Sequence, residues 1–333
     1  MKILYIANIR MPTEKAHGIQ IMETLHALAQ MNLIKTTLLV PRRVNQIIKD
    51  PFEYYGIEEN FKIVRLPTID LLFLPFFKKL WFFIESIVFA NCAFWYVLFS
   101  SKSICYTRDV LVALYLSFLT KPFFYEIHTL PERTSWIHSR VWKKSTGLVV
   151  ISNGLKKDLV HFGISEKKIC VVTDAVDTEK FQIKDSKEEC RKRLNLPQNK
   201  KIVLYTGHLY KWKGTDVLIE AAKKLDMGIL VYLVGGTEED AQNTKYKIQN
   251  TKNLVIIGHR SHKEIPYWLR AADMLVLPTS GKEKIGREYT SPMKLFEYMA
   301  SGTPIVASDT PAIREILDEK TAVFFEADNQ SDL

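Results

Sequence analysis

The feature that most constrains the fold is an alternation, along the whole chain, of short β-branched runs with stretches of helical periodicity. It begins with a strand expected at Lys2–Ile9 and a helix expected from about Gly18. This rhythm is typical of a parallel sheet covered by helices. Further strands are expected at Thr36–Val40, Ile104–Thr107, Phe123–His128, Leu148–Ser152 and Cys170–Asp174, and then at Ile202–Thr206, Leu230–Val234, Leu254–Ile257, Met274–Leu277, Ile305–Ala307 and Val323–Phe325.

The length of 333 residues exceeds what a single core usually supports. The apolar rhythm lapses into a charged segment before residue 201. We therefore expect an α/β chain of two Rossmann-like, doubly wound domains at residues 1–178 and 201–333, joined by a linker at 179–200 and facing a central cleft. In such sheets ligands bind at the carboxyl ends of the strands, where the informative residues of this chain fall.

The composition narrows the partners and the compartment. The formal charge of +9 indicates either a solvated basic surface or an anionic partner, such as a membrane surface or an anionic substrate. Nucleic acid ranks last, because no zinc-finger spacing or long basic tract occurs. The four cysteines form no CxxC pair, and the first residues lack a secretory signal, so we expect a cytoplasmic protein without a metal site.

One stretch complicates a purely soluble reading. Residues 80–99 are almost continuously apolar and aromatic, and Lys78 and Lys79 precede them. The run approaches the length of a membrane span, but Glu85 and Asn91 would be costly in lipid. We expect a buried or membrane-facing helix in preference to a span, and a peripheral membrane contact as its functional form.

The strongest chemical signal is residues 291–307, which read SPMKLFEYMASGTPIVA. Pro292 suits the start of a helix whose free amides and positive dipole end would bind an anion, and Lys294 adds a formal charge there. Glu297 could accept hydrogen bonds from a ribose diol. By spacing alone, Lys294 and Glu297 could equally form an i,i+3 ion pair on the helix surface.

This block resembles the donor-site signature of glycosyltransferase family 4, the retaining GT-B family of the glycosyl transferases group 1. The likeness extends, in order, to YTGHLYKWKG at 205–214, VGG at 234–236, NLVIIGHR at 253–260 and ADMLVLP at 272–278. Fainter likenesses in the N-terminal half are YEIH at 125–128, VVIS at 149–152 and VVTDAVDTEKF at 171–181. Several ordered segments make chance agreement improbable.

The resemblance implies a site on both halves of the chain. It makes His128 the catalytic residue, although a lone histidine at a strand end is more often structural. Gly18 would be the first-loop glycine that lets backbone approach the ligand. The implied donor-binding set is Gly18, Gly207, His208, Lys213, Arg260, Ser291, Pro292, Met293, Lys294, Leu295 and Glu297, with no metal ligand and no cofactor beyond the donor.

Two positions depart from the family pattern. His208 stands where the family has an arginine, so either fewer charges hold the diphosphate or His208 points elsewhere. Glu297 matches the second glutamate of the family's pair, but Tyr289 occupies the first position and Glu288 is one place early.

The implied activity is metal-independent hexosyl transfer, with retention, from a nucleoside diphosphate sugar to a glycan or a lipid-linked acceptor. We expect the segments 11–18 and 70–99 to read the acceptor, in cell-surface polysaccharide or glycolipid synthesis. The competing hypotheses are a GT-B epimerase or phosphorylase, and a non-catalytic sugar-nucleotide-binding homologue. Family members normally continue beyond the position of Leu333, so we expect a C-terminally truncated domain.

Overall fold

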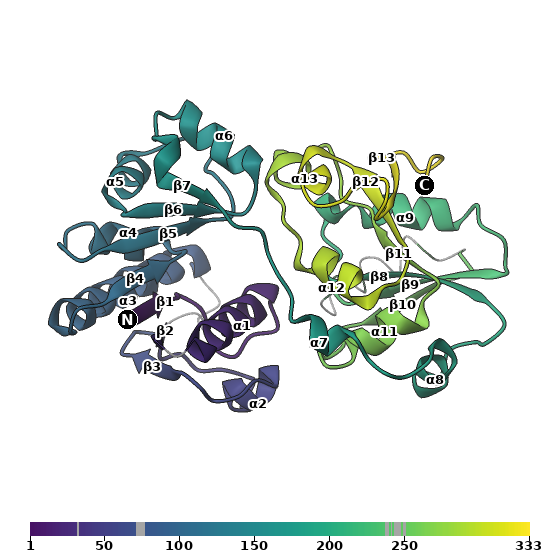
Figure 1. Cartoon of the computed structure of the whole chain (residues 1–333), viewed down its shortest axis with the longest axis horizontal. Helices are drawn as coiled ribbons and strands as arrows, with labels where there is room; N and C mark the ends of the chain where they lie inside the picture. The colour runs from purple at the N-terminus through teal and green to yellow at the C-terminus, as the bar shows by residue number, and fades with distance from the viewer. Residues whose placement is uncertain (32, 71–76, 237–239, 241, 243–247, 249–250) are drawn as a thin grey trace. The chain divides into compact units, whose positions relative to one another are not determined.

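The computed structural model describes residues 1–31, 33–70, 77–236, 240, 242, 248 and 251–333. These residues form two compact units. The N-terminal unit comprises residues 1–150 and 155–172, and the C-terminal unit comprises 151–154 and 173–333 (Figure 1). Residues 151–154 therefore belong to the C-terminal unit, although residues 155–172, which follow them, belong to the N-terminal unit.

The N-terminal unit is built on a parallel sheet of seven described strands in the order β3-β2-β1-β4-β5-β6-β7. The strands are β1 (Lys2–Ile6), β2 (Lys35–Pro41), β3 (Lys62–Leu66), β4 (Ile104–Thr107), β5 (Phe123–Ile127), β6 (Gly147–Val150) and β7 (Ile169–Val171). The helices are α1 (Ala16–Gln30), α2 (Pro51–Tyr55), α3 (Lys78–Phe99), α4 (Val110–Leu116), α5 (Trp136–Lys144) and α6 (Asn153–His161), with a 3-10 turn, η1 (Glu166–Lys168).

Both faces of this sheet are buried, which explains its unbroken apolar runs. Leu4, Tyr5 and Ile6 of β1 are all inaccessible to solvent although successive side chains point to opposite faces. Parallel crossovers are right-handed, so α1 and α2, which lead from β1 towards β3, cover one face. The helices α3 to α6 lead in the opposite direction and cover the other.

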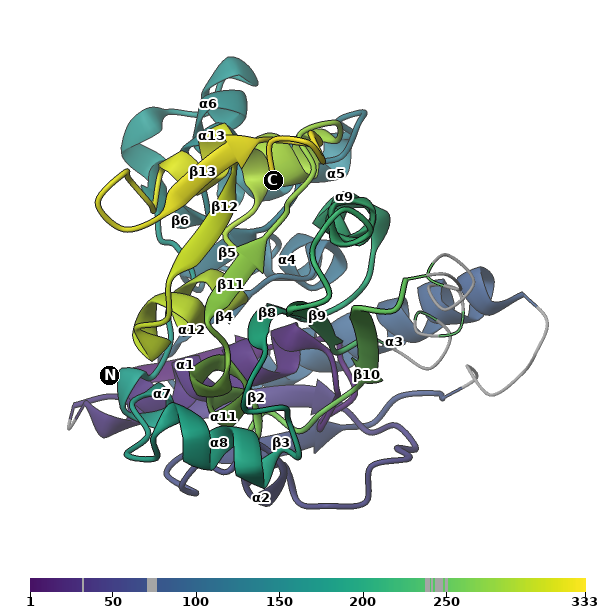
Figure 2. The ribbon, with the colours of Figure 1, turned by 90° about the vertical axis from the view of Figure 1, so that its right-hand side faces the viewer.

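The C-terminal unit has a parallel sheet of six described strands in the order β10-β9-β8-β11-β12-β13, which Figure 2 shows in sequence. The strands are β8 (Lys201–Thr206), β9 (Ile229–Val234), β10 (Leu254–Gly258), β11 (Met274–Leu277), β12 (Ile305–Asp309) and β13 (Val323–Glu326). The helices are α7 (Thr178–Phe181), α8 (Lys187–Arg193), α9 (Thr215–Ala222), α11 (Ile265–Ala271), α12 (Met293–Ser301) and α13 (Pro311–Arg314), with η2 (Lys211–Lys213) and η3 (Ile285–Tyr289). In Figure 2, α9 lies on one face of the sheet and α11 and α12 on the other.

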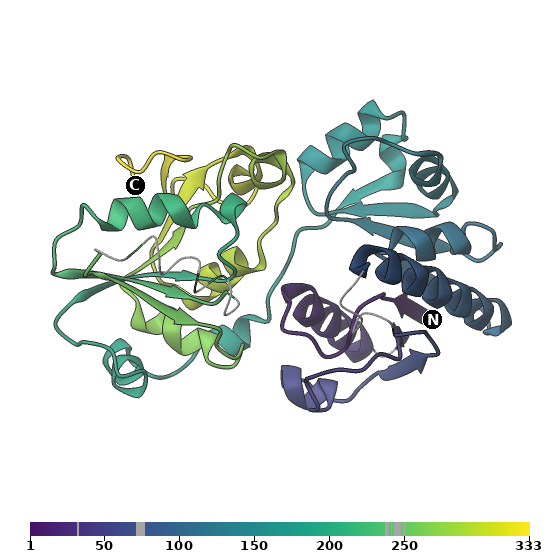
Figure 3. The same cartoon turned by 180° about the vertical axis from the view of Figure 1, so that it is seen from behind.

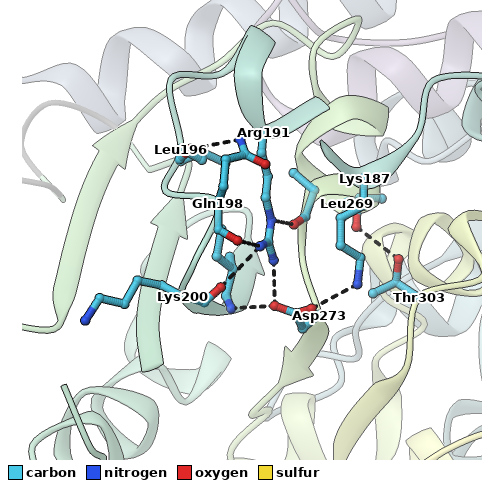
Figure 4. A network of polar contacts seen from close by, with 10 residues as sticks. Lys187, Arg191, Leu196, Gln198, Lys200, Leu269, Asp273 and Thr303 are labelled. Atoms are coloured by element: carbon cyan, nitrogen blue, oxygen red, sulfur yellow. Dashed lines mark hydrogen bonds and ion pairs between the residues drawn. The ribbon is translucent and has the colours of Figure 1, made fainter. Parts of the chain in front are cut away.

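The segment 179–200, expected to be a linker, is packed onto the C-terminal unit. Phe181 and Cys190 are buried in its core cluster. The guanidinium of Arg191 donates to the Ala271 carbonyl at 2.9 Å and to Asp273 at 2.6 Å, and Asp273 also accepts from the Ile202 amide (Figure 4). The high charge of this segment had indicated a solvated linker. One of its arginines, Arg191, is instead buried and hydrogen-bonded to the rest of the unit.

The apolar run at residues 80–99 forms α3, as the hydropathy suggested. Its one acidic side chain, Glu85, is fully buried and lies 3.2 Å from the buried guanidinium of Arg43. Of the segment expected to read the acceptor, residues 71–76 lie outside the described part of the chain. Strand β3 and the short helix α2 were not foreseen from the sequence.

The order of each sheet reverses at one pair of neighbouring strands, β1 and β4 in the N-terminal unit and β8 and β11 in the C-terminal unit. Loops leave the carboxyl ends of such a pair in opposite directions, which opens a space for a ligand. Polar side chains gather just after these strands in both units.

Candidate functional site

Two lysines converge beyond β8 and β11 in the C-terminal unit. Lys213 ends η2, the turn that follows β8, and Lys294 is the second residue of α12. Gly214 fixes the first of these elements: its φ is +72°, and a Cβ there would lie 1.6 Å from the Pro278 carbonyl oxygen. Only glycine allows η2 to pack this closely against the end of β11.

Lys294 has the most unusual environment of the predicted donor residues. It is buried, its Nζ lies 3.8 Å from the centroid of the Tyr205 ring, and no described residue accepts a hydrogen bond from it. Burial and the nearby charge of Lys213 both lower its pKa well below the usual range. A buried ammonium without a hydrogen-bonded partner is costly, so this geometry favours an incoming anion.

Lys213 lies close enough to influence Lys294. Its Nζ sits 3.8 Å from the Trp212 ring centroid, and burial lowers its pKa to about 8, against the opposing effect of Asp174. Asp174 stands where the family signature has an asparagine, and its amide donates to the Ser291 hydroxyl at 2.9 Å. The substituted carboxylate therefore lies beside one of the two lysines.

Gly207 and His208 lie next to the two lysines. A Cβ on Gly207, whose φ is +119°, would come within 2.7 Å of the Lys294 ammonium. The His208 ring stacks on Tyr210 at 4.9 Å, and its Nδ1 lies 3.8 Å from Asp240. Burial lowers the pKa of His208, and both lysines lower it further, so the histidine remains next to them instead of pointing elsewhere.

The first turn of α12 supplies backbone donors. Pro292 is the N-cap, and the first amides of a helix have no partner inside it. The amides of Met293 and Lys294 are therefore left without partners inside α12, as donors that an anion could use. Leu295 differs from the expectation, because its side chain is fully buried in the core and its amide donates to the Pro292 carbonyl at 2.8 Å.

Glu297 is not part of a surface ion pair. Its side chain is buried, and one carboxylate oxygen lies 2.9 Å from Nε2 of His262. The His262 ring in turn packs edge-on against Phe181 at 5.8 Å. The alternative i,i+3 pair with Lys294 is absent among the described contacts, since Nζ of Lys294 has no hydrogen-bond partner there.

The position of the missing first glutamate is filled by a buried aromatic residue. Tyr289 ends a π-helical turn, a conformation that often occurs near functional sites. Glu288 is paired with Arg287 at 3.0 Å. Arg260 is exposed, and its hydrogen bond among the described residues goes to the carbonyl of His259. The structure does not bring it to the lysines.

A second polar cluster lies at the carboxyl ends of β4 and β5 in the N-terminal unit. The His128 Nε2 lies 2.6 Å from Oε1 of Glu126, and the Arg108 guanidinium lies 2.9 Å from the same oxygen. Burial opposes ionisation of Glu126, but these two contacts outweigh it and lower its pKa to about 2. The carboxylate therefore stays charged and fixes the imidazole of His128.

The space beside Gly18 is filled by a side chain of another helix. Gly18 lies inside α1, where a Cβ would come within 2.2 Å of the Tyr55 hydroxyl. That hydroxyl bridges the backbone amide and carbonyl of Thr13 at 2.8 Å each. The missing side chain thus makes room for Tyr55. The preceding His17 is half-buried, and burial with nearby Lys15, Arg108 and His128 lowers its pKa to about 4.

Sequence reasoning missed Arg108, Glu126 and His262. The first two could have been found, since each occurs at the end of a strand that flanks or adjoins the reversal point of the sheet. His262 is visible only in three dimensions, because 35 residues separate it from Glu297. Among the described residues, no group of three or more His, Cys, Asp and Glu side chains could hold a metal ion.

Comparison with known proteins finds a family for part of the chain and a fold for the whole of it. Residues 186–333 match the family model described as glycosyl transferases group 1, so this part of the chain is a glycosyl transferases group 1 domain. The whole chain superimposes on the crystal structure of Anabaena Alr3699/HepE in complex with UDP, with a TM-score of 0.74 and 15% identity over 100% of this chain and 87% of that one. The fold is therefore GT-B.

The similar proteins of curated function match a smaller part of the chain. It is 29% identical over 161 residues to D-inositol 3-phosphate glycosyltransferase 1 of Catenulispora acidiphila, covering 44% of this chain and 37% of that protein. It is 30% identical over 172 residues to the lipopolysaccharide core biosynthesis mannosyltransferase LpsB of Rhizobium meliloti, covering 48% and 46%. The chain thus aligns with less than half the length of each relative.

Proposed function

We propose that the protein is a retaining glycosyltransferase of family 4 that binds the diphosphate of a nucleoside diphosphate sugar at Lys213, Lys294 and the first turn of α12. The observation that carries this proposal is the buried Lys294 ammonium, which has no hydrogen-bond partner among the described residues. A protein tolerates such a group where a ligand supplies the missing negative charge.

The similar proteins support the choice of ligand. The domain at residues 186–333 contains both lysines, Glu297 and His262. Anabaena Alr3699/HepE, which shares the fold, was crystallised with UDP and with UDP-glucose. The two named relatives are glycosyltransferases, one of them a mannosyltransferase, which favours a hexose as the transferred sugar.

The proposed reaction requires positive charge beside the departing diphosphate. As the acceptor oxygen bonds to the anomeric carbon, the bond from that carbon to the diphosphate breaks, and the departing oxygen takes the acceptor's proton on the same face. Lys213, Lys294 and the α12 amides would stabilise the negative charge that develops, without requiring a metal ion. Glu297, oriented by His262, would accept hydrogen bonds from the ribose.

We assign the catalytic histidine to His128 and the reading of the acceptor to the N-terminal unit. Glu126 would hold the His128 ring in one orientation, which a group acting beside a reacting sugar requires. The acceptor we propose is a glycan or a lipid-linked sugar, used in cell-surface polysaccharide or glycolipid synthesis, and the location we propose is the cytoplasm.

Thermal stabilisation by a panel of UDP-, GDP-, ADP- and CMP-sugars tests the donor site. The decisive variant is Lys294→Met, because replacing a buried, unpaired ammonium by an isosteric apolar group should stabilise the free protein by roughly 1–3 kcal/mol while abolishing the nucleotide-induced shift. Lys211→Met is the matched control, since it removes an exposed lysine of the same turn, η2, and should leave the shift intact.

A Lys294→Met protein that is less stable when free and still responds to the nucleotide would overturn the assignment. The non-catalytic alternative remains open because Tyr289 replaces the first glutamate of the family pair. Release of the free sugar or its transfer from the donor that gives the shift separates the two, since a binding protein would shift without turnover.

A further inference from the structure

The outward side of α3 is as apolar as its inward side. Phe89, Ala90, Ala93 and Val97 on the inward side are fully buried against the N-terminal unit. Helical spacing places a second apolar stripe opposite them, made up of Leu80, Ile84, Ile87, Val88, Asn91, Trp95 and Leu98. Asn91 is its one polar member. A helix on the surface of a soluble unit normally carries polar residues there.

This stripe is exposed over much of its length. Leu80 is 50% exposed, Trp95 49% and Leu98 40%, and Phe83 and Phe99 beside the stripe are 52% and 81% exposed. In Figure 3 no other element of the N-terminal unit is drawn across the near side of α3, the dark blue helix. A helix of this length, about 30 Å, thus presents one continuous apolar surface to its surroundings.

The contacts of α3 with the rest of the N-terminal unit decide whether the helix can cross a membrane or only lie on it. Residues 79–99 have a mean hydropathy of 1.7 and suffice in length to cross a bilayer. However, Glu85 is buried beside Arg43, and Lys121 donates to the Ser100 carbonyl at the carboxyl end of the helix at 2.7 Å. Crossing the bilayer would expose the Glu85 carboxylate to lipid, whereas lying flat leaves it inside the unit.

The charges near the stripe are positive. Lys79 is the second residue of α3 and Lys102 follows the end of the helix, and both are exposed. Between them the only acidic residue is the buried Glu85. A second copy of α3 packed on this stripe would bring lysines opposite lysines in either orientation. An anionic surface instead attracts both ends, and the aromatic side chains suit the interfacial zone of a bilayer.

We infer that α3 lies flat in the interface of an anionic phospholipid bilayer, with Leu80, Trp95 and Leu98 inserted and Lys79 and Lys102 at the headgroups. Binding of this kind combines the buried apolar area with electrostatic attraction, and it is reversible. The N-terminal unit would then hold the protein at the surface that carries lipid-linked acceptors. This inference does not depend on the donor-site proposal.

Co-sedimentation with vesicles of phosphatidylcholine, with and without one-third phosphatidylglycerol, tests it. The double variant Trp95→Gln/Leu98→Gln should bind at least tenfold more weakly to the anionic vesicles. Lys79→Gln/Lys102→Gln should weaken binding several-fold, with the loss largest at low salt. The matched control is Ile48→Gln, which removes another highly exposed apolar side chain from the same unit and should leave binding unchanged.

The remaining outcomes count against the inference. Unchanged vesicle binding by Trp95→Gln/Leu98→Gln would overturn it. So would a wild-type protein that ignores anionic vesicles but forms dimers in light scattering that the same variant dissociates, because the occupant of the stripe would then be a second copy. An unaltered thermal transition of the double variant shows that any loss of binding does not come from unfolding.

Discussion

The affinity of the protein for UDP should fall steeply above about pH 8, because Lys213 must be protonated to bind the diphosphate. Burial lowers the pKa of this lysine to about 8 in the free protein. A bound diphosphate favours the ammonium form and raises the pKa again. A group whose pKa is higher in the complex stabilises binding below its free-state pKa and loses that contribution as the pH rises through it.

The expected loss of affinity follows from the pKa of Lys213 in the free protein. If the complex keeps Lys213 protonated, the dissociation constant rises about tenfold per pH unit above 8, which amounts to about 25-fold, or ~1.9 kcal/mol, between about pH 7.5 and 9.5. Lys294, whose pKa is also lowered, can only steepen this dependence. The terminal phosphate loses its second proton at about pH 6 and does not contribute in this window.

Isothermal titration with UDP across this pH range, in buffers of different ionisation enthalpy, measures both the affinity and the protons taken up. Lys213→Arg is the informative variant, because an arginine stays charged throughout and should reduce the slope by one proton. If the affinity of the wild type does not depend on pH, or if Lys213→Arg shows the same pH dependence as the wild type, Lys213 does not bind the diphosphate as an ammonium group.

Three further outcomes concern stability. Arg191→Met should lower the free energy of unfolding by about 3 kcal/mol in urea titrations, because it leaves Asp273 without its buried partner. Glu126→Gln should cost up to ~3 kcal/mol above about pH 5, and the deficit in melting temperature should shrink as the pH falls from about 4.5 towards 2, where wild-type Glu126 itself becomes protonated. Gly214→Ala should destabilise by more than about 2 kcal/mol, because of its positive φ and the blocked Cβ position, whereas Gly228→Ala, with open space around its Cβ, should not; differential scanning calorimetry of the pair tests this.

The fold could be predicted from sequence because both sheets are parallel and buried on both faces. Such strands appear as unbroken apolar runs, and the expected strands at Ile104–Thr107 and Met274–Leu277 match β4 and β11. The edge strand β3 was missed because its Lys62 and Arg65 interrupt the apolar signal. The packed segment 179–200 was misread because a buried arginine cannot be told from a solvated one by composition.

The site was predictable only where it depends on local sequence. The start of α12 after Pro292 and the place of Lys294 in its first turn follow from one contiguous motif. The environment of Lys294 could not be inferred, since the Tyr205 ring against which its ammonium packs lies on β8 and not on α12. The surroundings of Gly18 could not be inferred either, because the side chain that fills the space beside it, Tyr55, lies on a separate helix.

The departures from the family pattern become consistent with one another once the charges are considered together. Replacing an arginine by His208 removes a permanent charge, and placing a carboxylate at Asp174 adds a negative one beside Lys213. Both changes lower the positive potential of the proposed donor site, in which the charge of Lys213 already lowers the pKa of Lys294. A site with an additional arginine would hold the free lysines still less readily in their charged form. In the proposed donor site the chain therefore gives up some attraction for the diphosphate, and its two lysines stay charged up to a higher pH than they would beside an additional arginine.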